Sequence, residues 1–212
     1  MVSLNNHSNK DYVCDYIHKE IPSPELKRST VEIPLRDGVI DVTKFLTSTP
    51  FYGNRQIVVD WELRAIREDW PYYHMAIMRD LHGQEVELVF DEDPEYAWLG
   101  VASVGMLQDH GATAGIRITV DAQPFKRRRN SETIFTETIS GDKNVTFQVS
   151  DMRAYPSFTA SAAGMTVTYD GETYTLPVGT SNIYGLYFTE GSHTLALHGS
   201  GTIGMTYRGG ML

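Results

Sequence analysis

The sequence predicts a mainly β protein with two β-sandwich-like domains, the first of which carries one packed α-helix. Three observations lead to this prediction. Apolar and polar residues alternate along most of the chain, which is typical of strands with one buried face. One segment carries the start and stop signals of a helix. Glycine-containing turns separate short apolar runs in the last third of the chain.

The charge distribution suggests a domain boundary near residue 130. Residues 1–130 hold 15 of the 18 Lys and Arg residues and 20 of the 27 Asp and Glu residues. Residues 131–212 are therefore sparsely charged. A chain of 212 residues is long enough for two small domains. We expect an N-terminal domain of residues 1–130 and a small C-terminal β-sandwich of residues 131–212.

Strands of the N-terminal domain are predicted by a period of two. In residues 56–63, Val59 and Trp61 share one face and the charged side chains share the other. Residues 85–90 and 115–120 repeat this alternation. Each of these segments should therefore form a half-buried strand.

A β-hairpin is expected earlier in the chain. Two short apolar runs, residues 31–33 and 40–42, flank Arg36, Asp37 and Gly38. An Asp-Gly pair between apolar runs is a strong signal for the turn of a hairpin.

One α-helix is predicted between Asp69 and Gly83. Asp69 is placed to cap the first turn, Pro71 suits its beginning, and Gly83 suits the C-terminal stop. Apolar side chains recur every fourth residue, as at Ile77 and Leu81, and so share one face. We expect a helix of about three turns that packs on a sheet.

The C-terminal domain is predicted to be a small antiparallel sandwich of short strands. Residues 165–169 and 174–176 alternate on either side of Asp170 and Gly171, which indicates a hairpin with a primed turn. The other strands are expected at residues 145–149, 186–188, 195–197 and 203–207.

Composition excludes several classes of protein. With a formal charge of −9, the chain lacks the excess of positive charge that is typical of a nucleic-acid-binding protein. Cys14 is the single cysteine, so no intrachain disulfide is possible. We expect no secretory signal in the first ten residues, which lack an apolar stretch. No apolar run approaches the length of a membrane helix.

The sequence predicts no catalytic, cofactor-binding or metal-binding residues and thus no enzyme. His74 and His82 are eight residues apart on the expected helix, about 12 Å along its axis, which is too far for one metal ion. His193 and His198 have odd spacing on an expected strand and should face opposite sides. We expect separate surface or capping histidines. No nucleophile motif or distinctive carboxylate pair supports a cell-wall hydrolase.

The acidic cluster from Asp91 to Glu95 has two interpretations. Several oxygens in one loop are what Ca²⁺ requires, but the calcium-loop spacing is missing. A solvated turn between strands, in which Pro94 fixes the backbone, is the favoured interpretation.

The run from Lys126 to Arg129 also has two interpretations, which the sequence leaves open. It is either a solvated linker or a basic patch that docks onto an acidic surface of a neighbouring subunit. Acidic flanks and the absence of interleaved aromatic residues argue against nucleic-acid binding.

Aromatic residues of the C-terminal part suggest an alternative function. Core or rim positions of a sandwich are the favoured interpretation, but stacking on sugars is possible for such side chains. The alternative is a carbohydrate-binding module that contributes to adsorption on a host surface. The residues concerned are Tyr155, Phe158, Tyr169, Tyr174, Tyr184 and Tyr187.

Several strings, taken in order, resemble the distal tail protein family of long-tailed (siphovirus-type) phages that infect Gram-positive bacteria. The resemblance covers nearly all of residues 7–126 and weakly the remainder. One departure is Leu35, where the family usually has glycine. The strings are residues 7–12, 21–25, 31–43, 51–55, 81–83, 91–96 and 121–126, together with Trp70, Gly100 and the terminus 207–212.

The resemblance implies a structural component of the virion tail, assembled in the host cytoplasm. The N-terminal domain would form a homohexameric ring that joins the tail tube protein to the tail-tip protein and to receptor-binding proteins in the baseplate. The C-terminal domain would be a galectin-like sandwich on the outside. DNA would pass through the lumen without being read, and an acidic lumen would repel it.

Overall fold

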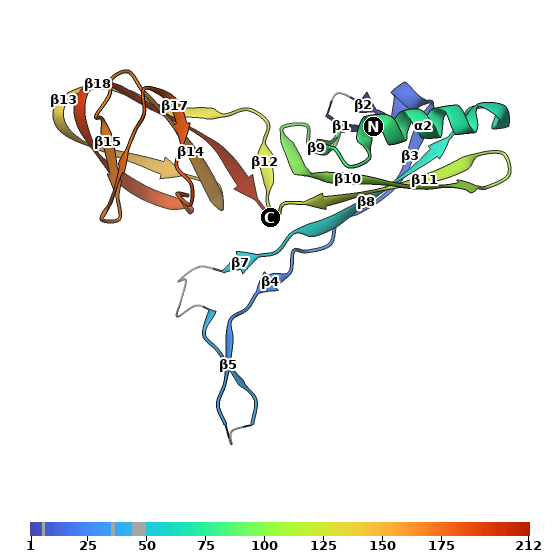
Figure 1. Cartoon of the computed structure of the whole chain (residues 1–212), viewed down its shortest axis with the longest axis horizontal. Coiled ribbons are helices and arrows are strands. Elements are labelled where there is room, and N and C mark those ends of the chain that lie inside the picture. The colour runs from blue at the N-terminus through green and yellow to red at the C-terminus, as the bar shows by residue number, and fades with distance from the viewer. Residues whose placement is uncertain (6, 35–36, 44–49) are drawn as a thin grey trace. The chain divides into compact units, whose positions relative to one another are not determined.

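A computed structural model describes residues 1–5, 7–34, 37–43 and 50–212. The expected turn residue Arg36 and the unusual Leu35 lie outside these residues. The chain is mainly β and forms two compact units (Figure 1). The first comprises Met1–Lys126 with Leu212, and the second comprises Arg127–Met211.

The first unit is built on one antiparallel sheet in the order β1-β9-β10-β11-β8-β3. The predicted strands at residues 56–63, 85–90 and 115–120 are confirmed as β8, β9 and β11. The bounds are β1 (Val2–Leu4), β9 (Glu85–Phe90), β10 (Tyr96–Asp109), β11 (Ala114–Ala122), β8 (Arg55–Leu63) and β3 (Cys14–Glu20).

Short elements complete this unit. The predicted hairpin around Gly38 is confirmed as β5 and β6, and Gly38 has the positive φ of 77° that its turn requires. The bounds are β2 (His7–Ser8), β4 (Leu26–Lys27), β5 (Thr30–Glu32), β6 (Val39–Asp41), β7 (Phe51–Tyr52), and the 3-10 turns η1 (Asn9–Tyr12) and η2 (Arg67–Asp69).

The predicted helix is confirmed as α2 (Trp70–Leu81), which covers one face of the sheet (Figure 1). Ile77 and Leu81 are fully buried in the core around Trp61. The expected cap is wrong, because the Asp69 side chain makes no capping hydrogen bond.

Cys14 lies in this core, and its burial leads to a testable prediction. Burial raises the pKa of the Cys14 thiol to about 12. The folded protein thus holds this proton more tightly than the unfolded chain does. The resulting stability is fully present below pH 9, the ordinary pKa, and is lost as the pH rises towards 12. At pH 8 we expect a thiol reagent to label Cys14 only when urea unfolds the chain. Equal labelling rates with and without urea would contradict this burial.

Two long paired strands form the frame of the second unit. Strand β13 pairs with β18 along its whole length, while β15 and β14 pair with successive parts of β18. Strand β18 thereby enters both layers of a sandwich. The bounds are β13 (Glu132–Val149), β14 (Arg153–Ala160), β15 (Thr166–Tyr169), β16 (Glu172–Thr175), β17 (Gly179–Asn182) and β18 (Gly191–Met211).

Glycines bend β18 where it passes from β15 to β14. Gly199 and Gly201 have φ of 130° and 143°, which other residues rarely adopt. A Cβ on Gly201 would also lie 2.7 Å from the Ser161 hydroxyl oxygen. The strands expected at residues 195–197 and 203–207 are therefore one bent strand, which corrects the sequence-based division.

Two other expectations for the second unit are settled by the strand pairing. The hairpin at Asp170 and Gly171 is confirmed as β15 and β16, with positive φ at both turn residues. The strand expected at residues 186–188 is wrong, because there only Phe188 makes an isolated bridge, to Ala154.

Candidate functional surfaces

The β5–β6 hairpin presents an apolar face that nothing in its own sheet covers. Val31 and Ile40 lie directly opposite each other, and the alternation places Ile33 on the same face. Val31 is 49% exposed and Ile33 is 41% exposed. A two-stranded hairpin is marginally stable by itself. These exposed side chains therefore favour a contact with another chain.

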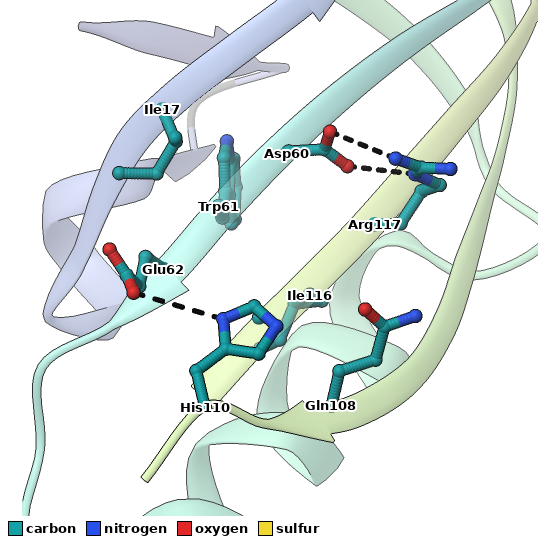
Figure 2. A pocket seen from close by; sticks show the side chains of 9 residues that line it. Ile17, Asp60, Trp61, Glu62, Gln108, His110, Ile116 and Arg117 are labelled. Carbon is teal, nitrogen blue, oxygen red and sulfur yellow. Dashed lines mark hydrogen bonds and ion pairs between the residues drawn. The ribbon is translucent and has the colours of Figure 1, made fainter. Parts of the chain in front are cut away.

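The sheet of the first unit turns a polar face away from α2. On this face Asp60 of β8 accepts two hydrogen bonds from Arg117 of β11, at 2.8 and 3.1 Å (Figure 2). His110 Nδ1 lies 3.8 Å from Glu62. These groups line a hollow of about 210 Å³. Each carboxylate drawn in the hollow thus has a cationic or imidazole neighbour.

Carboxylates predominate on this polar face. Strand register puts acidic side chains on four of the strands, and Arg117 is the strand residue that brings a positive charge among them. The electrostatic potential at this face is therefore negative. The acids are Asp15, Glu20, Asp60, Glu62, Glu85, Glu87 and Asp121.

The histidines make separate structural contacts. His74 Nε2 donates to the carbonyl of Gly105 at 2.9 Å, and the N–H of Val104 donates to His82 Nδ1 at 3.1 Å. The two imidazole rings thus link α2 and the residue after it to the irregular stretch of β10. His82 lies just beyond the helix and not on it, which corrects its expected place.

In the second unit, His193 and His198 face opposite sides of β18, as predicted. His193 bridges the Tyr169 hydroxyl and the Thr189 carbonyl at 2.8 and 2.7 Å. His198 is exposed and pairs with Asp142. Within the described ranges, no three His, Cys, Asp or Glu side chains are grouped as metal ligands.

The acidic turn after β9 distributes its carboxylates among different cations. Asp91 binds the N-terminal amine at 3.0 Å, while Glu92 pairs with Lys19 and Asp93 with Lys126. This dispersal favours the turn over a calcium loop, since calcium requires the oxygens to converge.

The described part of the chain contains no helix long and apolar enough to span a membrane.

The basic run is not a solvated linker, which corrects that interpretation. Lys126–Arg128 forms a short strand, β12. Lys126 pairs with Asp93, and Arg128 lies 3.5 Å from the buried carboxylate of Asp151. The Arg127 guanidinium lies over the Tyr155 ring at 4.5 Å. Most of these charges therefore have partners inside the chain, and docking of the run onto a neighbouring subunit stays a prediction.

The C-terminal aromatic residues divide between core and surface. Phe158 is fully buried, and Tyr169 packs edge-on against Phe188 at 5.0 Å. Tyr184, in contrast, is completely exposed. Together with Tyr155 it lines a groove of about 630 Å³ in the second unit.

Sequence reasoning missed three buried charged residues, Arg55, Asp151 and Arg153. Arg55 is 6% exposed and donates to the carbonyls of Pro22 and Pro124. Asp151 is 1% exposed, and its carboxylate lies 3.5 Å from the Arg128 guanidinium. Arg55 stands in the string 51–55 that resembles the tail family, which was the available signal. No local pattern marks Asp151.

Comparison with family models and with curated proteins gives no match. Among solved structures, the chain is similar to the Dit protein (gp 19.1) of phage SPP1, described as a paradigm of the hub adsorption apparatus in phages that infect Gram-positive bacteria. The similarity has a TM-score of 0.68 at 13% identity and covers 100% of this chain and 98% of that chain. A structure of the phage p2 baseplate matches with a TM-score of 0.41 at 7% identity, over 92% and 90%. The likeness to a distal tail protein is thus confirmed for the fold of the whole chain.

Proposed function

We propose that the chain is a structural subunit of a phage tail tip, in which six copies close into a ring between the tail tube and the tail-tip and receptor-binding proteins. The observation that carries the proposal is the full-length likeness in fold to the SPP1 hub protein. Residues 1–130 are proposed as the ring-forming domain and residues 131–212 as an outer, galectin-like accessory domain. The proposal includes assembly in the host cytoplasm and no catalytic activity.

The hairpin supplies one half of the proposed ring contact. A ring requires two different, complementary surfaces on each subunit, because each copy contacts its neighbours head to tail. On this apolar face Val31 and Ile33 are exposed and Ile40 is partly exposed, and the ribbon pairs only with itself among the described strands. Covering it with a neighbouring copy removes apolar surface from water, at about 25 cal/mol per Å².

The acidic face of the sheet fits the lining of such a ring. In the proposal it faces the lumen, and its carboxylates repel the phosphate backbone of passing DNA. Ion pairs such as Asp60–Arg117 hold the side chains in place without cancelling the excess of negative charge. In the proposal, the tail partners lie above and below the ring.

The ring is tested by native mass spectrometry of the full chain with a hairpin variant. We expect an assembly of about 143 kDa, six copies of 23.8 kDa. Val31→Glu should dissociate it, because it buries a charge in the apolar contact. Val39→Glu is the matched control, since Val39 is 56% exposed and lies on the opposite face of the same hairpin.

Each result decides a separate part of the proposal. A chain that stays monomeric at high concentration contradicts the ring. A ring that tolerates Val31→Glu contradicts the hairpin contact, and equal loss in both variants contradicts the assignment of its face. Unchanged thermal unfolding of both variants shows that assembly, and not folding, is affected.

A further inference from the structure

The groove of the second unit is independent of the proposed ring contact. It runs beside β14 and β17 and is bounded by residues 183–186 and by the end of β18. Its volume of about 630 Å³ suits a ligand of a few sugar or amino-acid units. No carboxylate is among the described side chains that line it.

Tyr184 is held at the edge of this groove in a position that folding does not explain. The N–H of Leu186 donates to the carbonyl of Ile183 at 3.3 Å, and Gly185 has φ of 85°. This is a tight turn with Tyr184 at its tip. Leu186 is buried and Ile183 packs on the core, so both ends of the turn are anchored. The anchored turn therefore places a fully exposed aromatic ring at the edge of the groove, where it is available for stacking.

Positive charge gathers at the other side of the groove. Burial and the neighbouring charge of Arg208 lower the pKa of the Arg127 guanidinium. The Arg127 guanidinium also lies over the Tyr155 ring. Arg127 and Arg208 both line the groove, whose described lining holds no carboxylate, and they supply positive charge for an anion.

Hydroxyl and amide groups fill the space between the aromatic and basic sides. The Ser157 hydroxyl donates to the Asn182 side-chain oxygen, which leaves the amide N–H groups of Asn182 as donors for a ligand. Other hydroxyl groups of the lining belong to Ser131, Thr180 and Thr206. Such groups match the many donors and acceptors of a sugar.

We propose that this groove binds an acidic saccharide. A sugar ring stacks on Tyr184, its hydroxyl groups meet the Ser, Thr and Asn side chains, and its carboxylate or phosphate faces Arg127 and Arg208. The small net charge of the second unit permits the approach of an anion. Six Lys and Arg against seven Asp and Glu give residues 127–211 a formal charge of −1, although the whole chain carries −9.

The test uses the full chain on an array of neutral, carboxylated and phosphorylated oligosaccharides, followed by calorimetry with the best-bound compound. We expect binding to acidic compounds, which weakens as NaCl rises from about 50 to about 500 mM. Tyr184→Ala should weaken binding about tenfold through lost stacking. Arg208→Gln should weaken binding of the acidic compound more than that of its neutral counterpart. Tyr72→Ala, at a residue 71% exposed in the first unit, is the matched control and should have no effect.

Every other outcome counts against the site. An array without binding, on a chain with unchanged thermal unfolding, overturns it, and so does binding that survives Tyr184→Ala. Binding restricted to neutral sugars overturns the acidic class. Displacement of the saccharide by an oligothymidylate at lower concentration would assign the groove to single-stranded nucleic acid instead. None of these results depends on ring formation, so failure here leaves the proposed assembly standing.

Discussion

Replacing Arg55 with alanine is expected to lower the free energy of unfolding by about 3 kcal/mol. Arg55 begins β8, and its guanidinium donates to the carbonyl oxygens of Pro22, at 3.2 Å, and Pro124. It also lies over the Trp98 ring at 4.5 Å. One buried side chain therefore joins two loops that are far apart in sequence.

The size of this effect follows from what the truncation leaves behind. Two carbonyl groups in a partly buried place would lose a charged donor, at a cost of about 1–3 kcal/mol each. Arg55 is 6% exposed, so little water reaches it, and this burial lowers the pKa of its guanidinium. Arg55→Lys should recover only part of the loss, because an ammonium group has no planar fork for two acceptors.

Urea unfolding followed by tryptophan fluorescence measures this prediction. Arg64→Ala is the matched control, since Arg64 is 51% exposed and pairs with Asp15 and Glu62 at the surface. Its loss should cost no more than about 1 kcal/mol. Equal costs for the two variants would show that the Arg55 bridge contributes nothing beyond an ordinary surface pair.

Gly209→Ala is expected to destabilise the second unit by about 3 kcal/mol. A Cβ at this position would lie 2.1 Å from the Cγ and Oδ2 of Asp151. The carboxylate is 1% exposed and lies 3.5 Å from the Arg128 guanidinium, so it has little room to move. The backbone of Gly209 is fixed by its pairing with Ala154.

A double-mutant cycle identifies the cause. With Asp151→Ala the clashing atoms are gone, and the added cost of Gly209→Ala should fall below about 1 kcal/mol. Asp151→Ala itself should destabilise, since it removes the acidic partner of Arg128. Thermal or urea unfolding of the four proteins gives the coupling energy. Additive costs would show that Gly209 is small for a reason other than Asp151.

Local patterns were enough for much of the fold. Residues 56–63 alternate because β8 has one face on the core, and the helix from Trp70 to Leu81 follows from its apolar stripe and its Pro and Gly signals. The Asp170–Gly171 turn was equally readable, because few other pairs adopt positive φ at both positions.

The sequence did not predict strand β10, and the packing of the neighbouring strand β11 explains why. Gly100 interrupts the apolar pattern, but a Cβ there would lie 2.3 Å from the Asp121 carbonyl oxygen on β11. The glycine is therefore a requirement of strand packing. The sequence likewise predicted two strands, at residues 195–197 and 203–207, whereas Gly199 and Gly201 bend one strand across both layers.

The sequence by itself determined the β class, the position of the one predicted helix and the resemblance to phage tail proteins. These depend on neighbours along the chain, or on strings kept in order. Only the tertiary structure decided the partners of charged residues. Arg55 reaches Pro124, Arg128 reaches Asp151, and Arg127 comes to share a groove with Tyr184. Such pairs lie tens of residues apart, and folding alone brings them within hydrogen-bond or ring-contact distance.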